Sequence, residues 1–164
     1  MVTQSTEGRL ASSSHGLATG VDGLAAAFYA WLLLVARVLL GLIFVLSGYG
    51  KLTGLAAFSA SLAARGVPAA EVFGVVGACV EFFGGIAVVL GLATRYVALL
   101  MIVFVVVATM ISHRFWEYAD PQQFRAQQGQ FMKNVTILGG YVLLFVCGGG
   151  RFSMDALVPR LRSS

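Results

Sequence analysis

Residues 24–50 read LAAAFYAWLLLVARVLLGLIFVLSGYG, and Arg37 is their only charged residue. A transmembrane α-helix needs about 20 mostly apolar residues to cross the hydrocarbon core of a bilayer. This stretch is long enough to do so, and it is longer than the apolar part of a secretory signal peptide, which is the alternative interpretation. We therefore expect residues 24–50 to be a retained transmembrane helix.

Three further apolar stretches follow, at residues 69–91, 96–112 and 135–148. The stretch at 96–112 is barely long enough to cross a bilayer, so it is expected to take in His113. The last stretch becomes a span only if it begins near Phe131 and lets Lys133 reach the interface. We predict an all-α integral membrane protein, a four-helix bundle with both termini on one side of the bilayer.

The connections between these stretches are also informative. Residues 92–95 are too few for anything but a tight turn, so the second and third spans must be antiparallel neighbours. Residues 51–68 contain apolar side chains at helical spacing, which favours a short interfacial helix. The connection at 114–130 carries aromatic side chains, which suit the headgroup region.

The composition agrees with a membrane protein. Of the 164 residues, 59% are hydrophobic and 11% are charged, against about 25% charged residues in soluble domains. The formal net charge is +4, but Lys and Arg are scattered singly between apolar runs. The expected partner is therefore the lipid bilayer and not nucleic acid.

The chain is expected to hold one domain. We predict a four-helix transmembrane domain at residues 24–152, a flexible polar tail at residues 1–23 and a C-terminal tail at residues 153–164. Basic residues divide evenly between the two ends of the bundle. The acids in the connection at 114–130 favour cytoplasmic termini.

Two charges fall inside the predicted spans. Counted from the terminal side, Arg37 lies about eleven residues into the first span and Glu81 about ten residues into the second. An isolated charge at the bilayer centre costs about 2.5–3.5 kcal/mol, so we expect Arg37 and Glu81 to pair inside the bundle. Such a pair either fixes the register of two helices or takes part in proton or substrate binding, and the sequence leaves both roles open.

Stripes of small residues accompany both charges. Small residues let membrane helices approach closely, so these stripes are expected to face each other. They comprise Gly41 and Gly48 in the first span and Gly74, Gly77, Gly84 and Gly85 in the second.

A second group of polar residues lies at the opposite membrane face. Lys51 ends the first span, His113 ends the third, and Lys133 and Asn134 open the fourth. Their side chains suit an anionic or carbonyl-bearing ligand such as a quinone head group. The alternative is that Lys51, His113 and Lys133 are ordinary interfacial anchors.

Cysteine and metal chemistry are not indicated. Cys79 and Cys147 differ in depth by roughly 15 Å at 1.5 Å per residue, whereas a disulfide needs Cα atoms within about 7 Å. His15 and His113 are split between the tail and the bundle. No metal site is predicted.

Several segments together resemble the DoxX family of small four-helix bacterial membrane proteins. The resemblance runs from Arg37 to Asp155 and rests on the order and spacing of its parts. These are RVLLGLIFVLSGYGK at 37–51, VEFFGG at 80–85, LGLATR at 90–95, His113, FMKN at 131–134, Gly139 with Gly140, and GRFSMD at 150–155.

The resemblance implies a multi-pass protein of the bacterial cytoplasmic (inner) membrane. It also implies a membrane subunit or anchor of an oxidoreductase system, because some members resemble subunits of thiosulfate:quinone oxidoreductase and others accompany thiol- or superoxide-handling enzymes. Quinone would be the cofactor, and a soluble redox enzyme or a second copy of the chain the partner. The functional positions would be Arg37, Lys51, Glu81, His113, Lys133 and Asn134. We expect no soluble catalytic domain and no paired cysteines, which argues against independent catalysis. The alternatives are a non-catalytic scaffold that recruits a redox or stress-response enzyme, and small-molecule export.

Overall fold

A computed structural model describes residues 3–157, with side chains from residue 21 onward, and within this range all regular structure is helical. The elements are α1 (Thr3–Thr53), α2 (Leu55–Ala64), α3 (Ala70–Leu90), α4 (Thr94–Ser112), the 3-10 turn η1 (Phe115–Glu117), α5 (Pro121–Cys147) and α6 (Met154–Leu157). Four segments are long and apolar enough to span a membrane: Val21–Thr53, Ala70–Leu90, Thr94–Glu117 and Pro121–Cys147. The predicted all-α fold with four spans is confirmed.

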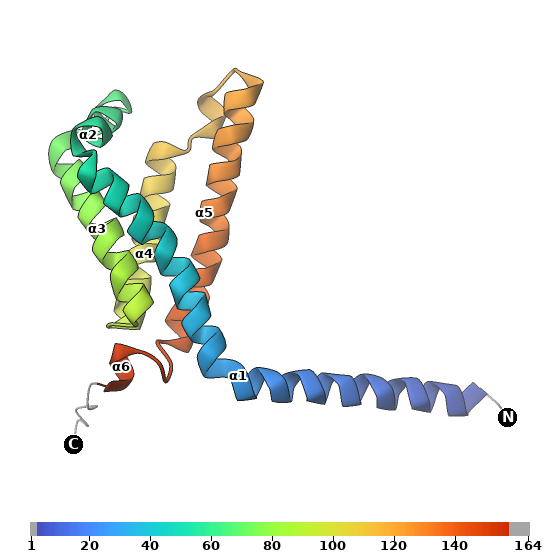
Figure 1. The fold of residues 1–164 in the computed structure, drawn as a ribbon. Coiled ribbons are helices and arrows are strands. Elements are labelled where there is room, and N and C mark those ends of the chain that lie inside the picture. Colours follow the sequence, from blue (N-terminus) through green and yellow to red (C-terminus); the bar gives the residue numbers. More distant parts are fainter. Residues whose placement is uncertain (1–2, 158–164) are drawn as a thin grey trace.

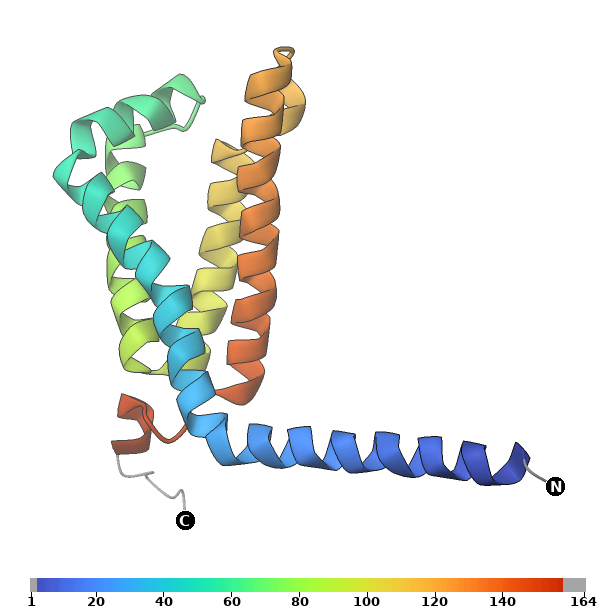
Figure 2. The ribbon, with the colours of Figure 1, turned by 45° about the vertical axis from the view of Figure 1, so that its right-hand side comes forward.

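The N-terminal region differs from the expected flexible tail, because α1 is already helical at Thr3. No proline precedes Pro68, so nothing in residues 3–23 forbids a continuous helix. Figures 1 and 2 show that this part of α1 bends away from the bundle and runs to one side. Residues 1 and 2 lie outside the described range.

The closest helix packing joins α1 to α3 through the predicted small residues. A Cβ atom on Gly41 would lie 2.6 Å from the carbonyl oxygen of Gly85, and one on Gly48 would lie 2.6 Å from the backbone nitrogen of Phe82. Gly84 faces the other way, with the sulfur of Met101 on α4 at 2.6 Å from its would-be Cβ. Gly74 faces a third helix, with Oγ of Ser59 on α2 at 2.5 Å from its would-be Cβ. The glycines of α3 are therefore divided among α1, α2 and α4 and do not all face α1 as predicted, and they let these helices approach closely.

The bundle consists of two helix pairs that meet at one end and diverge at the other. In Figures 1 and 2, α1 lies beside α3 and α4 lies beside α5, and the pairs separate toward α2 and η1. The turn from α3 to α4 is tight, as predicted, with Gly91 at φ 68° and Ala93 at φ 44°. The core between the pairs comprises Phe44, Val88, Ala98, Met101, Val105, Ile137, Tyr141 and Leu144.

The fourth span is longer than its apolar residues suggested. Helix α5 begins at Pro121, with the Asp120 side chain accepting a hydrogen bond from the backbone N–H of Gln123. Proline at the first helical position and an aspartate cap are strong helix starts. Most of the expected connection at 114–130 is therefore the first part of α5, and the predicted short helix after the first span is α2.

Candidate functional site

Glu81 forms an ion pair, but its partner is Lys51 and not Arg37. Glu81 lies on α3 and is only 4% exposed. Its Oε2 atom accepts a hydrogen bond from Nζ of Lys51, near the end of α1. The predicted Arg37–Glu81 pair is therefore wrong, although both charges do lie inside the bundle.

The register of α1 against α3 explains the error. Gly48 packs on the backbone of Phe82, so these two residues lie at the same level. Lys51, about one turn further along α1, is then level with the side chain of Glu81, whereas Arg37, about three turns back, reaches the far end of α3. Because α1 begins well ahead of the bundle, distance from its first apolar residue does not give depth.

One cavity brings the other candidate residues together. It has a volume of about 130 Å³, and its lining includes Lys51, Glu81, His113, Lys133 and Asn134. The sequence predicted the convergence of four of them. Glu81 joins the group because α1 ends beside the middle of α3. The result, here called the polar cavity, holds two ammonium groups, a carboxylate, an imidazole and an amide.

Neighbouring glutamines orient two of these side chains. Nδ1 of His113 lies 2.9 Å from Oε1 of Gln127, and Nζ of Lys133 donates to Oε1 of Gln130 at 2.7 Å. With the amide oxygen of Gln127 accepting, Nδ1 of His113 carries the proton and Nε2 is a free acceptor. Sequence reasoning missed both glutamines because it placed them in an irregular connection, whereas they occupy turns of α5.

Asn134 is held by α4. Its Nδ2 atom donates to Oγ1 of Thr109 at 2.8 Å, and that hydroxyl donates to the carbonyl oxygen of Val105 at 2.6 Å. Thr109 was also missed, since a threonine inside an apolar span carries no pattern that marks it. The amide of Asn134 keeps an acceptor oxygen and a second N–H for another partner.

A larger cleft continues from the polar cavity. It has a volume of about 790 Å³ and lies between α2 and α3 on one side and the end of α4 on the other, where the two helix pairs diverge (Figures 1 and 2). The cleft and the polar cavity share Ser47, Lys51, Phe104, Ala108, Ser112, His113 and Lys133. The cleft is therefore the access route to the polar cavity.

The walls of the cleft are apolar and face outward. Val76 of α3 and Val107 of α4 line it and are each about half exposed, at 52% and 51%. In a bilayer, apolar side chains exposed on spanning helices contact acyl chains. The cleft thus joins a polar interior to a surface that the hydrocarbon core would cover.

Arg37 belongs to a separate group at the terminal end of the bundle. It is fully buried, and Nη2 donates to the carbonyl oxygen of Phe152 in the segment after α5. The ring of Phe152 packs on Trp31 of α1 with centroids 4.5 Å apart. Residues 150–157, here called the C-terminal strap, therefore fold back onto the bundle, which corrects the prediction of a tail from residue 153. Residues 158–164 of that predicted tail lie outside the described range.

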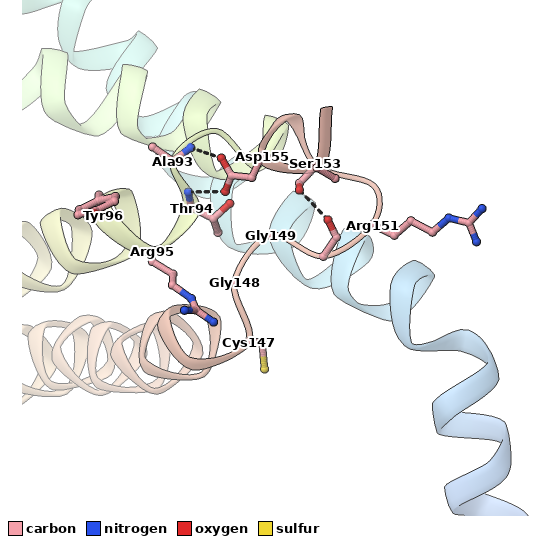
Figure 3. Close-up of a pocket in the computed structure, with 12 residues that line it drawn as sticks. Ala93, Thr94, Arg95, Tyr96, Cys147, Gly148, Gly149, Arg151, Ser153 and Asp155 are labelled. Atoms are coloured by element: carbon pink, nitrogen blue, oxygen red, sulfur yellow. Dashed lines mark hydrogen bonds between the residues drawn. The ribbon is translucent and has the colours of Figure 1, made fainter. Parts of the chain in front are cut away.

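The C-terminal strap caps α4. The carboxylate of Asp155 accepts hydrogen bonds from the backbone N–H groups of Ala93 at 2.6 Å and Thr94 at 2.8 Å (Figure 3). Burial alone raises the pKa of Asp155, but the donors of Thr94 and Ala93 and the charge of Arg37 outweigh it and hold the pKa below its ordinary value. The negative charge of this carboxylate is also favourable because the N-terminus of a helix carries a partial positive charge.

A pocket of about 780 Å³ lies beside this cap. Its lining runs from Ala93 to Tyr96 and from Cys147 to Ala156, with the exception of Phe152 and Met154. Figure 3 shows Asp155 turned toward the start of α4, Arg95 lying over the end of α5, and Arg151 pointing away. The charged groups that line this pocket either bond to the main chain, as Asp155 and Arg95 do, or point outward, as Arg151 does. The polar cavity is therefore the better candidate for a ligand site.

These features define a small polytopic α-helical membrane protein with a polar cavity at the base of a laterally open cleft. The DoxX family profile matches residues 32–114, which include Arg37, Lys51, Glu81 and His113. The chain belongs to the DoxX family.

Two relatives come from Escherichia coli strain K12. The chain is 36% identical over 127 residues to inner membrane protein YqjF, covering 77% of this chain and 92% of that protein. It is 32% identical over 124 residues to inner membrane protein YphA, covering 76% and 88%. No solved structure matches the chain. With the four apolar helices, these relatives support a multi-pass protein of the inner membrane; the sidedness of the termini stays a prediction.

Proposed function

We propose that this protein is the membrane subunit or anchor of an oxidoreductase system and that it binds quinone, with the head group in the polar cavity and the tail in the cleft. One observation carries the proposal: a convergent set of hydrogen-bonding groups, among them the buried Glu81, adjoins an apolar cleft of about 790 Å³. Ligand pockets of roughly 300–1,000 Å³ with a few convergent polar groups are typical of small-molecule sites.

The residues present fit a quinone head group. Lys51, Lys133 and Asn134 provide N–H donors for ring carbonyl oxygens, while Glu81 and Nε2 of His113 provide acceptors for ring hydroxyls. When bound, the quinone would supply the exchange of two electrons and two protons. The contribution of the chain would be to orient the ring and to hold exchangeable protons at Glu81 and His113.

Quinone titration of the purified protein tests this proposal. We expect a short-chain quinone to bind the wild type and to bind at least tenfold more weakly to Glu81→Gln and to His113→Ala, since each loses a polar contact in a desolvated site. Glu71→Gln is the matched control, because Glu71 is an exposed residue in the first turn of the same helix. If neither variant differs from this control, the site assignment is wrong.

A second function, a non-catalytic scaffold that recruits a soluble redox or stress-response enzyme, is favoured by the shape of α1. Its N-terminal part extends from the bundle (Figures 1 and 2), where it would be accessible to a partner. Crosslinking in cells discriminates: recovery of a redox enzyme that is lost when residues 3–20 are deleted would support the scaffold. Recovery of the chain only with itself and lipids would count against it.

A further inference from the structure

The charges that line the cleft are unbalanced. Arg65, Arg114 and Lys133 line it together with Lys51, and no acidic residue is among its lining. Lys51 is paired with Glu81 in the adjoining polar cavity. Arg114 is paired outside the cleft, with Nη1 lying 2.9 Å from Oε1 of Glu117.

Two cations remain without an acidic partner within the part of the chain that the structure describes. Arg65, which follows α2, has a 3.4 Å contact from Nη1 to the carbonyl oxygen of Ser61. Lys133 on α5 donates only to the neutral side chain of Gln130. These two residues come from the two helix pairs that the cleft separates, so each wall contributes one uncompensated positive charge.

A contact places Arg65 beside the end of α4. Arg114 donates a long hydrogen bond, 3.5 Å, to the carbonyl oxygen of Arg65, and it directly follows His113, which lines the cleft and the polar cavity together with Lys133. Most of the other lining side chains are apolar, and some of them are open to the side, such as Val76 and Val107. The cleft is therefore amphipathic.

We infer that the cleft binds a long-chain carboxylate, with its acidic head between Arg65 and Lys133 and its acyl chain along Val76 and Val107. The excess of positive charge favours an anion, and the apolar walls favour a hydrocarbon chain that continues into the bilayer. At about 30 Å³ for each water-sized group, a cleft of about 790 Å³ has room for a carboxylate and a long acyl chain.

This inference does not depend on the proposed function, although the two meet at the same cleft. A fatty acid there would block the passage of a quinone tail and would so compete with quinone. The two sites share Lys133 and are distinguished by the residues that only one of them uses: quinone binding is expected to depend on Glu81 and His113, and carboxylate binding on Arg65.

The test is equilibrium binding of radiolabelled oleate to the purified full chain in a neutral detergent. We expect saturable binding, and a loss of affinity of about tenfold or more in the Arg65→Gln/Lys133→Gln double variant, because a charge-assisted hydrogen bond is lost at each position. Arg125→Gln is the matched control: Arg125 is an exposed residue of α5 that does not line the cleft. Affinity in the double variant equal to that of this control would overturn the inference.

The acyl chain is tested by filling the cleft. Val107→Trp is expected to abolish oleate binding, whereas Val103→Trp, on the same helix and 56% exposed but outside the cleft, is expected to leave it unchanged. Methyl oleate, the uncharged match, should not compete. Equal competition by methyl oleate, or by phosphatidylglycerol added in the same detergent at equal concentration, would refute a carboxylate as the occupant.

Discussion

The contact between the C-terminal strap and α4 allows a quantitative prediction for Asp155→Asn. Helix α4 has no capping side chain of its own, since Ala93 holds the cap position. Asp155 supplies the cap from the far end of the chain, through two backbone N–H donors at 2.6 and 2.8 Å. The substituted amide keeps one acceptor oxygen, so one of the two hydrogen bonds is lost, at about 0.5–1.5 kcal/mol, and loss of negative charge at a helix N-terminus costs about 0.3–1 kcal/mol. We therefore expect a destabilisation of roughly 1–3 kcal/mol.

The loss should depend on pH in a defined direction. Because the folded-state pKa of Asp155 is lowered from 3.8, its carboxylate contributes its full stabilisation above that value. The contribution is lost only as the pH falls below 3.8 and through the lowered pKa of the folded protein. Wild type and Asp155→Asn should therefore differ most at neutral pH, and the difference should shrink in strong acid.

Thermal unfolding of the purified chain in detergent measures the effect. For a chain of this size, 1 kcal/mol shifts Tm by roughly 2–4 °C, so the expected decrease is roughly 2–12 °C by the same conversion. Asp22→Asn is the control, because Asp22 is an exposed aspartate on α1. An Asp155→Asn variant that unfolds at the temperature of this control at pH 7 would refute the assignment of Asp155 as the cap.

Three further predictions concern the bundle interior and use the same unfolding measurement. Gly48→Ala should destabilise the folded protein by about 1–3 kcal/mol, because the added Cβ would lie 2.6 Å from the backbone of α3. Gly139→Ala, whose Cβ would have nothing within 4 Å, should be neutral, and equal effects of the two variants would contradict the packing of α1 on α3. Lys51→Met alone should destabilise more than Lys51→Met with Glu81→Leu, since the single change leaves a buried carboxylate unpaired; additive losses would mean that the two do not interact. Tyr141→Phe should be neutral or stabilising by up to about 1–3 kcal/mol, because the buried hydroxyl of Tyr141 has no hydrogen-bond partner among the described residues. A lower Tm would reveal a hydrogen bond to that hydroxyl.

The architecture was predictable because a bilayer limits the choices. Backbone polar groups in hydrocarbon must be satisfied within the segment, so an apolar run such as residues 24–50 has little alternative to a helix. The turn at residues 92–95 is too short for any arrangement but two antiparallel neighbouring helices. The extent of α1 before residue 24 and of α5 before residue 135 was not predictable in this way, since hydropathy records where lipid begins and not where a helix begins.

The site was predictable in part. Lys51, His113, Lys133 and Asn134 could be grouped because helix ends on one side of a bundle must lie near one another. The pairing of Glu81 depended on helix register, which is set by contacts such as that of Gly48 with Phe82 and which hydropathy does not encode. The same charge was therefore assigned to the wrong partner while its burial was assigned correctly.

The two ends of the bundle handle buried charge by different means, and this difference bears on function. At the terminal end, Arg37 is buried with the main-chain carbonyl of Phe152 as its partner, and the C-terminal strap, which also brings Asp155 nearby, covers it. At the other end, Glu81 is buried with Lys51, whose side chain is 30% exposed, beside an open cavity. A charge sealed by its own chain can fix structure, but it cannot meet a ligand without unfolding the strap. Within the folded bundle, Lys51 or Glu81 can bind a ligand in place of the other member of the ion pair. We therefore expect ligand binding at Lys51 and Glu81 and a structural role for Arg37.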